Sequence, residues 1–215
     1  KLSGEYYSGY HLKKFNHKNP VNILIEASNG ASDYGNKIGE PIIGGFTRSF
    51  GMKINNQFIE WTKPIMFSAG IGSINNSHIY KKEPQEGMFI VRIGGPAYKI
   101  GLGGGFSSSL DQNEDREELN FSAVQRGDPQ MENKLNRVIQ SLIDLDDNNP
   151  IISIHDQGAG GLANVVKEII FPNGGEIDLD NVTLGDNSLQ PLEIWCSEFQ
   201  ESDVLLINEC NIDLL

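Results

Sequence analysis

The chain has 215 residues, of which 38% are hydrophobic and 21% charged, and its formal net charge is −12. A chain of this length forms one large domain or two small ones, and it can bury about two thirds of its unfolded surface. The negative charge excludes a general nucleic-acid binder, which needs a basic face. Nucleotides remain possible ligands, because Mg²⁺ can neutralise their phosphates.

Cysteine usage and apolar runs narrow the class of protein further. Cys196 and Cys210 show no CxxC spacing, so we expect neither a disulfide framework nor a zinc site, and the chain fits a reducing cytoplasm. No apolar run approaches the roughly 20 residues of a membrane span, and no signal peptide is visible at Lys1. Because the chain begins without Met and stops just after an apparent core strand, we expect an excised piece of a longer protein.

The first part of the chain predicts glycine-rich loops and short strands. Residues 21–25 fit a short strand or, since Pro20 suits a first helical position, the start of a helix. Residues 27–45 are rich in Gly, Ser and Asn, which predicts a polar loop that either connects elements or lines a ligand. Strands are expected within 42–50, which contains two adjacent glycines, and at 64–70.

A linker and a second glycine-rich loop are expected in the middle of the chain. Residues 75–86 are polar and contain a proline, which predicts a linker or a domain boundary, and 88–93 fit a strand. Residues 94–109 then combine glycine with serine. They match neither a Walker A loop nor a Rossmann fingerprint, so a phosphate-binding loop and a flexible hinge both remain open.

A helix is predicted from residue 129 onwards. The acidic run 111–120 is expected to be a solvated loop. Asp128 and Pro129 then fit the N-cap and the first residue of a helix. Its expected apolar stripe consists of Met131, Leu135, Val138, Ile139 and Leu142.

Residues 150–168 carry the strongest local pattern. The β-branched run 151–154 predicts a buried strand that stops at His155 and Asp156, glycines allow a tight turn, and helical periodicity begins at Leu162. An acid at a strand end, followed by a helix N-terminus, can hold a cation beside an anion. The alternative is that Asp156 caps the helix and the glycines only permit close packing.

The last part of the chain predicts two strands around a short helix. Ile177 and Leu179 alternate with acids, as in a half-buried strand, and 203–207 fit a closing core strand. Residues 191–201 place acids beside aromatics, which indicates either a ligand wall or the amphipathic face of a short helix. Neither a nucleophile elbow nor an HExxH pattern is present, so nothing here predicts covalent catalysis.

Four stretches resemble, in this order, the family of phosphoribosylformylglycinamidine synthases, also called formylglycinamide ribonucleotide amidotransferases. They are residues 36–50, 63–73 with 93–105, 121–132 with 154–164, and 192–201. Ordered motifs spread over about residues 20–207 are far more specific than any single one. The resemblance implies an α+β fold of the aminoimidazole ribonucleotide synthetase superfamily, truncated at both ends. Residues 1–84 would be the tail of an α/β subdomain and residues 85–215 a second, mixed α+β subdomain.

The resemblance implies an ATP- and Mg²⁺-dependent ligase of purine biosynthesis. The formyl amide oxygen of formylglycinamide ribonucleotide is phosphorylated, and ammonia from glutamine displaces the phosphate to give an amidine. Such a reaction depends on positioning and on charge stabilisation. Matched to the family residue by residue, Gly44, Gly45 and Phe46 are expected to contact ATP and Asp156 a metal ion, and the expected ribonucleotide ligands are Gln125, Glu198, Phe199 and Gln200.

Two departures from the family pattern limit these expectations. Bacterial members often have Glu-Ser-Gln where this chain has Glu198, Phe199 and Gln200, and Phe199 has no hydroxyl, which leaves it only a backbone contact. The upstream catalytic His, the second pseudo-repeat and the glutaminase domain are not found in the sequence. We therefore expect no catalytic residue and no activity in this piece alone, partner domains in the parent chain, and artificial dimerisation through exposed strands.

Two alternatives stay open at this stage. Aminoimidazole ribonucleotide synthetase, selenophosphate synthetase and thiamine monophosphate kinase share the acid and glycine turn but not residues 94–105 together with 195–200. The second alternative is a non-catalytic copy of the fold that holds a nucleotide structurally. The presence of Asp156 and Glu198 favours the catalytic copy.

Overall fold

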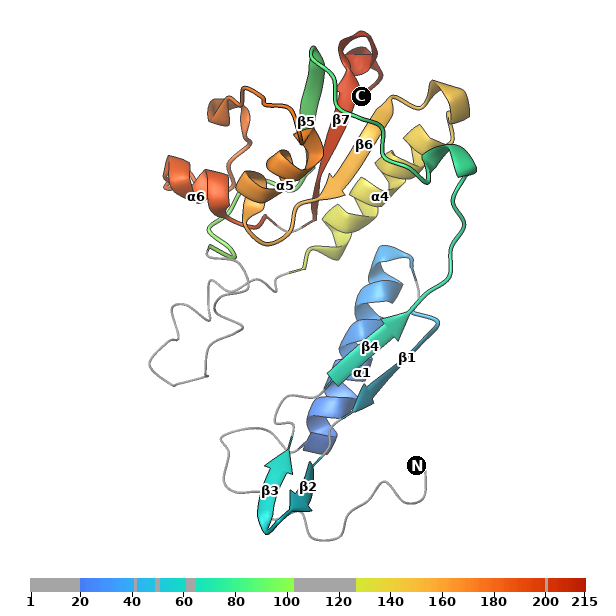
Figure 1. Cartoon of the computed structure of the whole chain (residues 1–215), viewed down its shortest axis with the longest axis vertical. Helices are drawn as coiled ribbons and strands as arrows, with labels where there is room; N and C mark the ends of the chain where they lie inside the picture. The colour runs from blue at the N-terminus through green and yellow to red at the C-terminus, as the bar shows by residue number, and fades with distance from the viewer. Residues whose placement is uncertain (1–19, 41, 49–50, 61–64, 103–126, 200) are drawn as a thin grey trace. The chain divides into compact units, whose positions relative to one another are not determined.

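The computed structural model describes residues 20–40, 42–48, 51–60, 65–102, 127–199 and 201–215. By its internal contacts the chain divides into two compact units, Lys1–Gly72 and Ser73–Leu215 (Figure 1). The predicted domain boundary after residue 84 stays a prediction. Across the described ranges, no helix combines the length and the apolar character that crossing a membrane requires.

The first unit contains one long helix and two antiparallel strand pairs. Its elements are α1 (Pro20–Ile38), β1 (Gly44–Arg48), β2 (Gly51–Ile54), β3 (Gln57–Glu60) and β4 (Ile65–Ala69). β1 pairs with β4 and β2 with β3. Asn55 and Asn56 have φ angles of 48° and 66°, the left-handed conformation that a two-residue hairpin turn needs, and they form the turn between β2 and β3.

Helix α1 corrects one expectation from composition. Residues 27–38, predicted as part of a polar loop, are helical, and the ambiguity at 21–25 is resolved in favour of a helix. Their polar side chains bond along the helix surface: Ser32 Oγ donates to the carbonyl of Ser28 at 3.2 Å, and Lys37 Nζ lies 2.5 Å from Asp33 Oδ2. Of these contacts, the i to i+4 ion pair of Asp33 with Lys37 supports the helix.

The strands of the first unit leave apolar side chains exposed. Phe46 on β1 stacks on Phe67 of β4 with ring centroids 5.5 Å apart, yet both rings remain about half exposed. The other large exposed apolar residues of these strands are Met52, Ile54, Ile59, Ile65 and Met66. An apolar surface of this kind normally marks an interaction face, although dimerisation through it stays a prediction.

The second unit is built on a three-stranded antiparallel sheet in the order β5-β7-β6. The strands are β5 (Met88–Gly94), β6 (Ile151–Asp156) and β7 (Ser202–Asn208). The α-helices are α4 (Pro129–Ile143), α5 (Gly161–Ile170) and α6 (Pro191–Cys196). Short 3₁₀ turns are η1 (Asn76–His78), η3 (Asp146–Asn148), η4 (Leu179–Asn181) and η5 (Glu209–Leu214).

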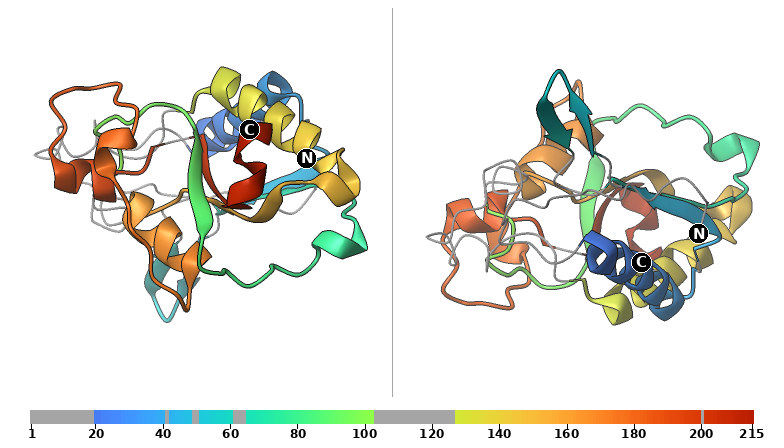
Figure 2. Two further views of the ribbon diagram at one scale, coloured as in Figure 1. Left: turned by 90° about the horizontal axis from the view of Figure 1, so that it is seen from above. Right: turned by 90° about the horizontal axis from the view of Figure 1, so that it is seen from below.

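Strand β7 contributes buried residues to both faces of the sheet, because helices cover both faces. Helices α4 and α5 lie on opposite sides (Figures 1 and 2). Val204 and Leu206 belong to the buried cluster that α5 forms with this face. Leu205 and Ile207 alternate with them and are buried on the other face. A strand buried on both faces must be a continuous apolar run, which is what the sequence shows there.

Most predicted elements of this unit are confirmed and two details are wrong. The strands expected at 88–93, 151–154 and 203–207 and the helices expected from 129 and 162 are present. No strand forms at residues 177–179, because the Asp178 side chain accepts a hydrogen bond from the Asp180 amide at 3.0 Å and starts η4 instead. Val138 is 46% exposed and so lies outside the apolar stripe of α4.

The N-terminus of α4 gives a direct test of this local structure. Asp128 Oδ1 accepts hydrogen bonds from the amides of Gln130 and Met131, both at 3.1 Å. We predict that Asp128→Ala lowers the free energy of unfolding by about 1 kcal/mol in urea denaturation, because two helix amides lose their acceptor. Asp144→Ala is the matched control at the other end of α4, where an acid caps no amide and opposes the helix dipole. An equal loss in both variants would contradict the capping role.

Candidate functional site

Three loops of the second unit meet at one end of its sheet. Residues 95–101 follow β5, residues 157–160 follow β6, and residues 197–201 lead into β7. Because β7 is antiparallel to both neighbours, its first residues pair with the last residues of β5 and β6. We call these three segments, as far as the structure describes them, the three-loop site.

Main-chain hydrogen bonds hold the loops together. The Gly95 amide donates to the carbonyl of Glu201 at 3.2 Å, and the Glu198 amide donates to the carbonyl of Ile100 at 2.9 Å. These bonds do not depend on side-chain type. They connect residues 95–100 of the glycine-rich segment to the loop before β7. Residues 103–109 lie outside the described residues, and the choice between a phosphate-binding loop and a hinge for residues 94–109 stays open.

The turn before α5 is closed by a glycine contact. Gly161 has φ +59°, and a Cβ placed on it would lie 2.2 Å from the carbonyl oxygen of Ser197. The N-cap of α5 is Gly160, so the idea that Asp156 caps this helix is wrong, whereas close packing by a glycine is confirmed. The Asp156 side chain is 86% exposed and hence available to a ligand.

Four carboxylates influence one another near this end of the sheet: Asp156 at the end of β6, Glu198 before β7, Asp203 on β7 and Glu132 on α4. Burial, and then the charge of Asp156, raise the pKa of Glu198. Burial, Glu132 and Asp156 together raise the pKa of Asp203 to about 6. Burial is the largest cause of both shifts and the neighbouring negative charges add to it, so a nearby cation would favour the charged carboxylates.

The donor set fits a hard cation only in part. Mg²⁺ is commonly bound by one or two carboxylates together with substrate phosphates and water, and an exposed aspartate suits that role. In the part of the chain that the structure describes, no group of three His, Cys, Asp or Glu side chains is arranged to hold a metal ion. Asp156 therefore offers one ligand, and a complete shell needs oxygens from elsewhere.

His155 ties the end of β6 to α5. Its Nε2 lies 2.8 Å from Glu168 Oε2, and Asn164 Nδ2 donates to the other oxygen of that carboxylate at 3.1 Å. The pair was not predicted from the sequence. The available signal was the i to i+4 spacing of Asn164 and Glu168 on the helix that follows His155.

Arg92 lies beneath the three-loop site and was also missed. Its Nη2 donates to Ser202 Oγ at 2.9 Å and to the carbonyl of Gly95, and its Nε donates to Gln157 Oε1 at 3.4 Å. Burial lowers its pKa to about 10. A single cation inside the apolar run of β5 was the signal that could have drawn attention to it.

The structure places only some of the predicted ribonucleotide ligands in the three-loop site. Glu198 is half-buried in the three-loop site beside Asp156. Phe199 is 1% exposed, so its ring belongs to the core and only its backbone is available to a ligand. Gln125 and Gln200 lie outside the described residues, and their roles stay predictions.

The predicted ATP contacts lie in the first unit. Gly44, Gly45 and Phe46 form the start of β1, opposite Ala69, Ser68 and Phe67 of β4. A Cβ on Gly45 would lie 2.4 Å from the carbonyl oxygen of Phe67, whereas one on Gly44 would meet nothing within 4 Å. The backbone close to Gly45 is therefore that of the chain's own β4, and contact with ATP stays a prediction.

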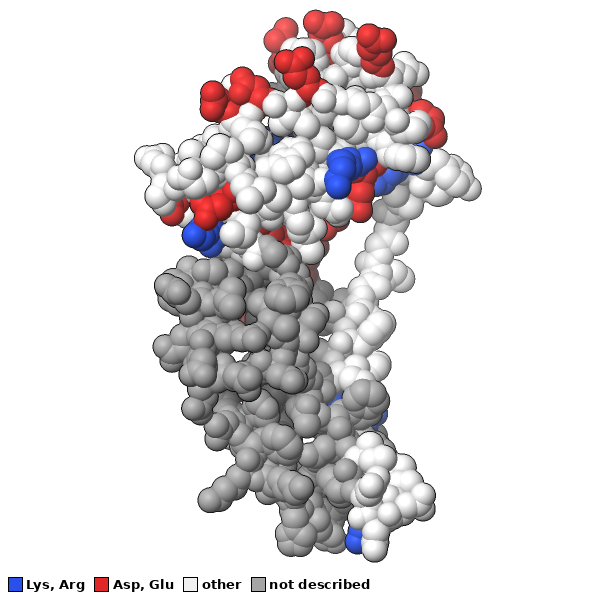
Figure 3. All heavy atoms as spheres, turned by 60° about the vertical axis from the view of Figure 1, so that its left-hand side comes forward, with Lys and Arg blue, Asp and Glu red and all other residues white. Residues whose placement is uncertain are grey.

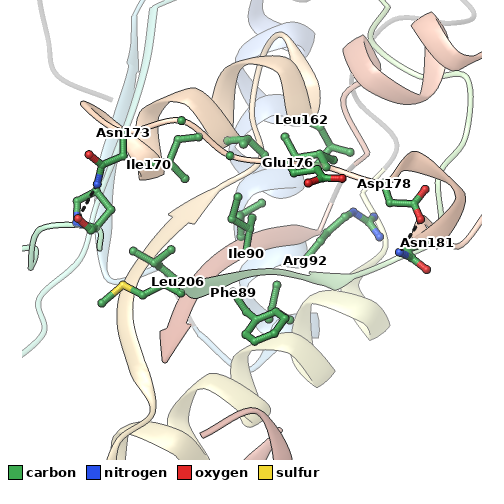
Figure 4. A pocket seen from close by; sticks show the side chains of 18 of the residues that line it. Phe89, Ile90, Arg92, Leu162, Ile170, Asn173, Glu176, Asp178, Asn181 and Leu206 are labelled. Carbon is green, nitrogen blue, oxygen red and sulfur yellow. Dashed lines mark hydrogen bonds between the residues drawn. The ribbon is translucent and has the colours of Figure 1, made fainter. Parts of the chain in front are cut away.

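A cavity of ≈ 1090 Å³ lies between α5 and β5, and Arg92, which contacts the three loops, is one of its lining residues (Figure 4). Its lining includes apolar side chains of both elements, such as Ile90 and Leu162, with Glu176 and Asp178 among its acids. Asp156 and Glu198 do not line it. The charged groups on the face of this unit in Figure 3 are mostly acidic, so that face offers no basic patch for nucleic acid.

Comparison with known proteins identifies the family to which the second unit is similar. The family described as "AIR synthase related protein, C-terminal domain" matches residues 85–211. A probable phosphoribosylformylglycinamidine synthase, chloroplastic/mitochondrial, of Arabidopsis thaliana is 57% identical over 91% of this chain and 14% of its own length. The human phosphoribosylformylglycinamidine synthase is 52% identical over 93% of this chain and 15% of its own length. The chain thus spans about one seventh of these two relatives.

Solved structures agree on the fold. A Thermotoga maritima PurL complexed with FGAR is 24% identical and superposes with a TM-score of 0.63, covering 86% of this chain and 29% of that one. The same protein complexed with ATP gives 22% identity and a TM-score of 0.60, covering 86% and 27%. The mixed α+β fold predicted from the sequence is confirmed.

The two glycines of β1 are a matched pair for mutation. We predict that Gly45→Ala weakens the β1–β4 pairing by about 1–3 kcal/mol, because the new methyl group meets a backbone carbonyl. Amide hydrogen exchange in β1 and β4 should therefore become faster. Gly44→Ala, with open space around it, should leave exchange unchanged. Faster exchange in both variants would disprove the steric argument.

Gly161 is predicted to be irreplaceable for folding of the three-loop site. Gly161→Ala should cost more than about 2 kcal/mol in urea denaturation, because strain at positive φ adds to a contact with the backbone of Ser197. Gly174→Ala is the control, since a Cβ there meets nothing within 4 Å. Nearly equal urea midpoints of unfolding for the two variants would show that the contact between the loops can be lost without a loss of stability.

Proposed function

This chain belongs to the family of AIR synthase related proteins, as a segment of a phosphoribosylformylglycinamidine synthase, and from this premise we propose that its three-loop site is one wall of the amidine-forming site. The parent protein converts formylglycinamide ribonucleotide, glutamine and ATP into formylglycinamidine ribonucleotide, glutamate, ADP and phosphate. The 215-residue chain alone is inactive, because the rest of the pocket and the source of ammonia lie in other parts of the parent protein.

The observation that carries this proposal is the meeting of Asp156 and Glu198. They are 42 positions apart in the sequence, yet their loops are bonded to each other: the Gln157 amide donates to the carbonyl of Ser202 at 2.9 Å, and Gln157 Nε2 donates to the carbonyl of Ser197 at 3.5 Å. Burial, and then the charge of Asp156, raise the pKa of Glu198. Coulomb interactions of this kind need proximity. The two acids that the family pattern assigns to metal and substrate thus share one loop cluster.

Each acid has a distinct task in the proposed site. Asp156, with its exposed carboxylate, holds Mg²⁺, which when bound supplies positive charge to the phosphate oxygens during phosphoryl transfer. Glu198 accepts hydrogen bonds from donors of the ribonucleotide and fixes its orientation. Gln125 and Gln200 add amide groups to the same substrate, and Phe199 adds a backbone contact.

ATP is proposed to contact Gly44, Gly45 and Phe46. Support comes from the family pattern and from the relatives, since the Thermotoga maritima PurL was solved complexed with ATP and with ADP. The exposed ring of Phe46 offers a stacking surface for a base.

We place the parent protein in the cytoplasm, while the Arabidopsis relative is named as chloroplastic/mitochondrial.

The test uses the full-length parent protein with Asp156→Asn and Glu198→Gln. We predict that each lowers kcat/KM about 100-fold or more, because each removes a charge that the transition state needs. Asp156→Asn should also raise the Mg²⁺ concentration for half-maximal activity. Glu198→Gln should raise KM for formylglycinamide ribonucleotide and leave KM for ATP unchanged.

Asp147→Asn is the matched control for both variants. Asp147 is an exposed acid on η3, next to the opposite end of β6, so it should keep wild-type kinetics. Full activity of Asp156→Asn and Glu198→Gln would refute the site assignment and favour a copy of the fold that holds its nucleotide only structurally.

A further inference from the structure

We propose that Arg92 is a positioning residue that holds Glu198 in the orientation for binding the ribonucleotide, an inference that rests on the proposed function. Arg92 lies on β5, directly opposite Val204 of β7, and its side chain is on the face covered by α5. It is not expected to touch the substrate. Its effect passes through Phe199, the neighbour of Glu198.

Arg92 is unusual because its partners are all neutral. A buried cation normally requires a carboxylate partner to offset its desolvation. Within the described residues, Arg92 makes no ion pair, and its bonds go to an amide oxygen, a hydroxyl and a carbonyl. The folded protein thus keeps a partly buried guanidinium without a carboxylate partner, which points to a purpose of its geometry beyond folding.

The guanidinium contacts each of the three loops. Its Nη2 reaches the carbonyl of Gly95 and its Nε reaches Gln157, so it joins the loops after β5 and β6. Arg92 Cζ lies 5.1 Å from the ring centroid of Phe199, a cation–π distance, so it also holds the loop before β7. Only a planar group with several fixed donors can make these contacts together.

Fixing the Phe199 ring also fixes the residue before it. Phe199 is 1% exposed, while Glu198 is half-buried and faces the charge of Asp156. The Glu198 amide is bonded to Ile100 of the first loop, so a shift of the ring would move both the backbone and the carboxylate. A displacement of about 1 Å in a positioning group can reduce activity by as much as 100-fold.

The first experiment measures steady-state kinetics of the full-length parent protein carrying Arg92→Lys. Lysine keeps the charge but cannot reach several acceptors and stack on a ring at once. We expect KM for formylglycinamide ribonucleotide to rise roughly tenfold, with kcat and KM for ATP within about twofold of wild type. The control is Arg137→Lys on the exposed surface of α4, which should change none of these values.

A double-mutant cycle with Glu198→Gln separates positioning from general support of the fold. If Arg92 acts through Glu198, Arg92→Lys should raise KM little further once Glu198→Gln is present, so the two effects are not multiplicative. An unchanged KM in Arg92→Lys, or multiplicative effects in the double variant, would overturn the proposal. Failure of the proposed function itself would appear as a wild-type KM in Glu198→Gln alone.

Amide hydrogen exchange gives a readout that needs no activity. In the full-length protein, Arg92→Lys should lower protection in residues 95–101 and 197–202, while residues 162–170 of α5 keep theirs. Equal protection of the loops in Arg92→Lys and in wild type would show that the guanidinium does not hold them, whatever reaction the parent protein catalyses.

Discussion

The central position of β7 is the constraint on which the second unit depends. It pairs along its length with β5 and β6, and helices on both faces bury its alternate side chains. Because it runs antiparallel to both neighbours, the loops that follow them and the loop that precedes it must meet. The candidate site is thus a consequence of strand order, which brings loops distant in the sequence to one end of the sheet.

The site places its charges in two layers. Asp156 is exposed and Glu198 half-buried at the outer side, where burial and the charge of Asp156 together raise the pKa of Glu198. Arg92 lies beneath them among neutral groups, behind the ring of Phe199. Such an arrangement keeps the guanidinium from neutralising the outer acids, which leaves them free for a metal ion and a polar substrate.

Local sequence patterns predicted most of the helices and strands, whereas the contacts between them could be seen only in the folded structure. Asp128 with Pro129, and the apolar runs of the strands, identify elements because cap preference and periodicity are local properties. The Gly-, Ser- and Asn-rich composition of residues 27–38 misled the prediction for α1, because composition favours turns while these residues are helical. The bonds of Arg92 span 65 residues to Gln157 and 110 to Ser202, a separation that no local pattern reveals. The roles of Asp156 and Glu198 were expected only through resemblance to a family, and their proximity was not predicted.

The stacking of Arg92 on Phe199 has an evolutionary consequence. A serine at position 199, as in the bacterial pattern, would leave the guanidinium without its ring, and an apolar residue at 92 would leave Phe199 without its cation. Either substitution alone leaves one partner of the cation–π contact without the other, while both together leave neither partner unmatched. The two positions are therefore expected to diverge as a pair, so that lineages with and without this interaction form separate, internally consistent groups.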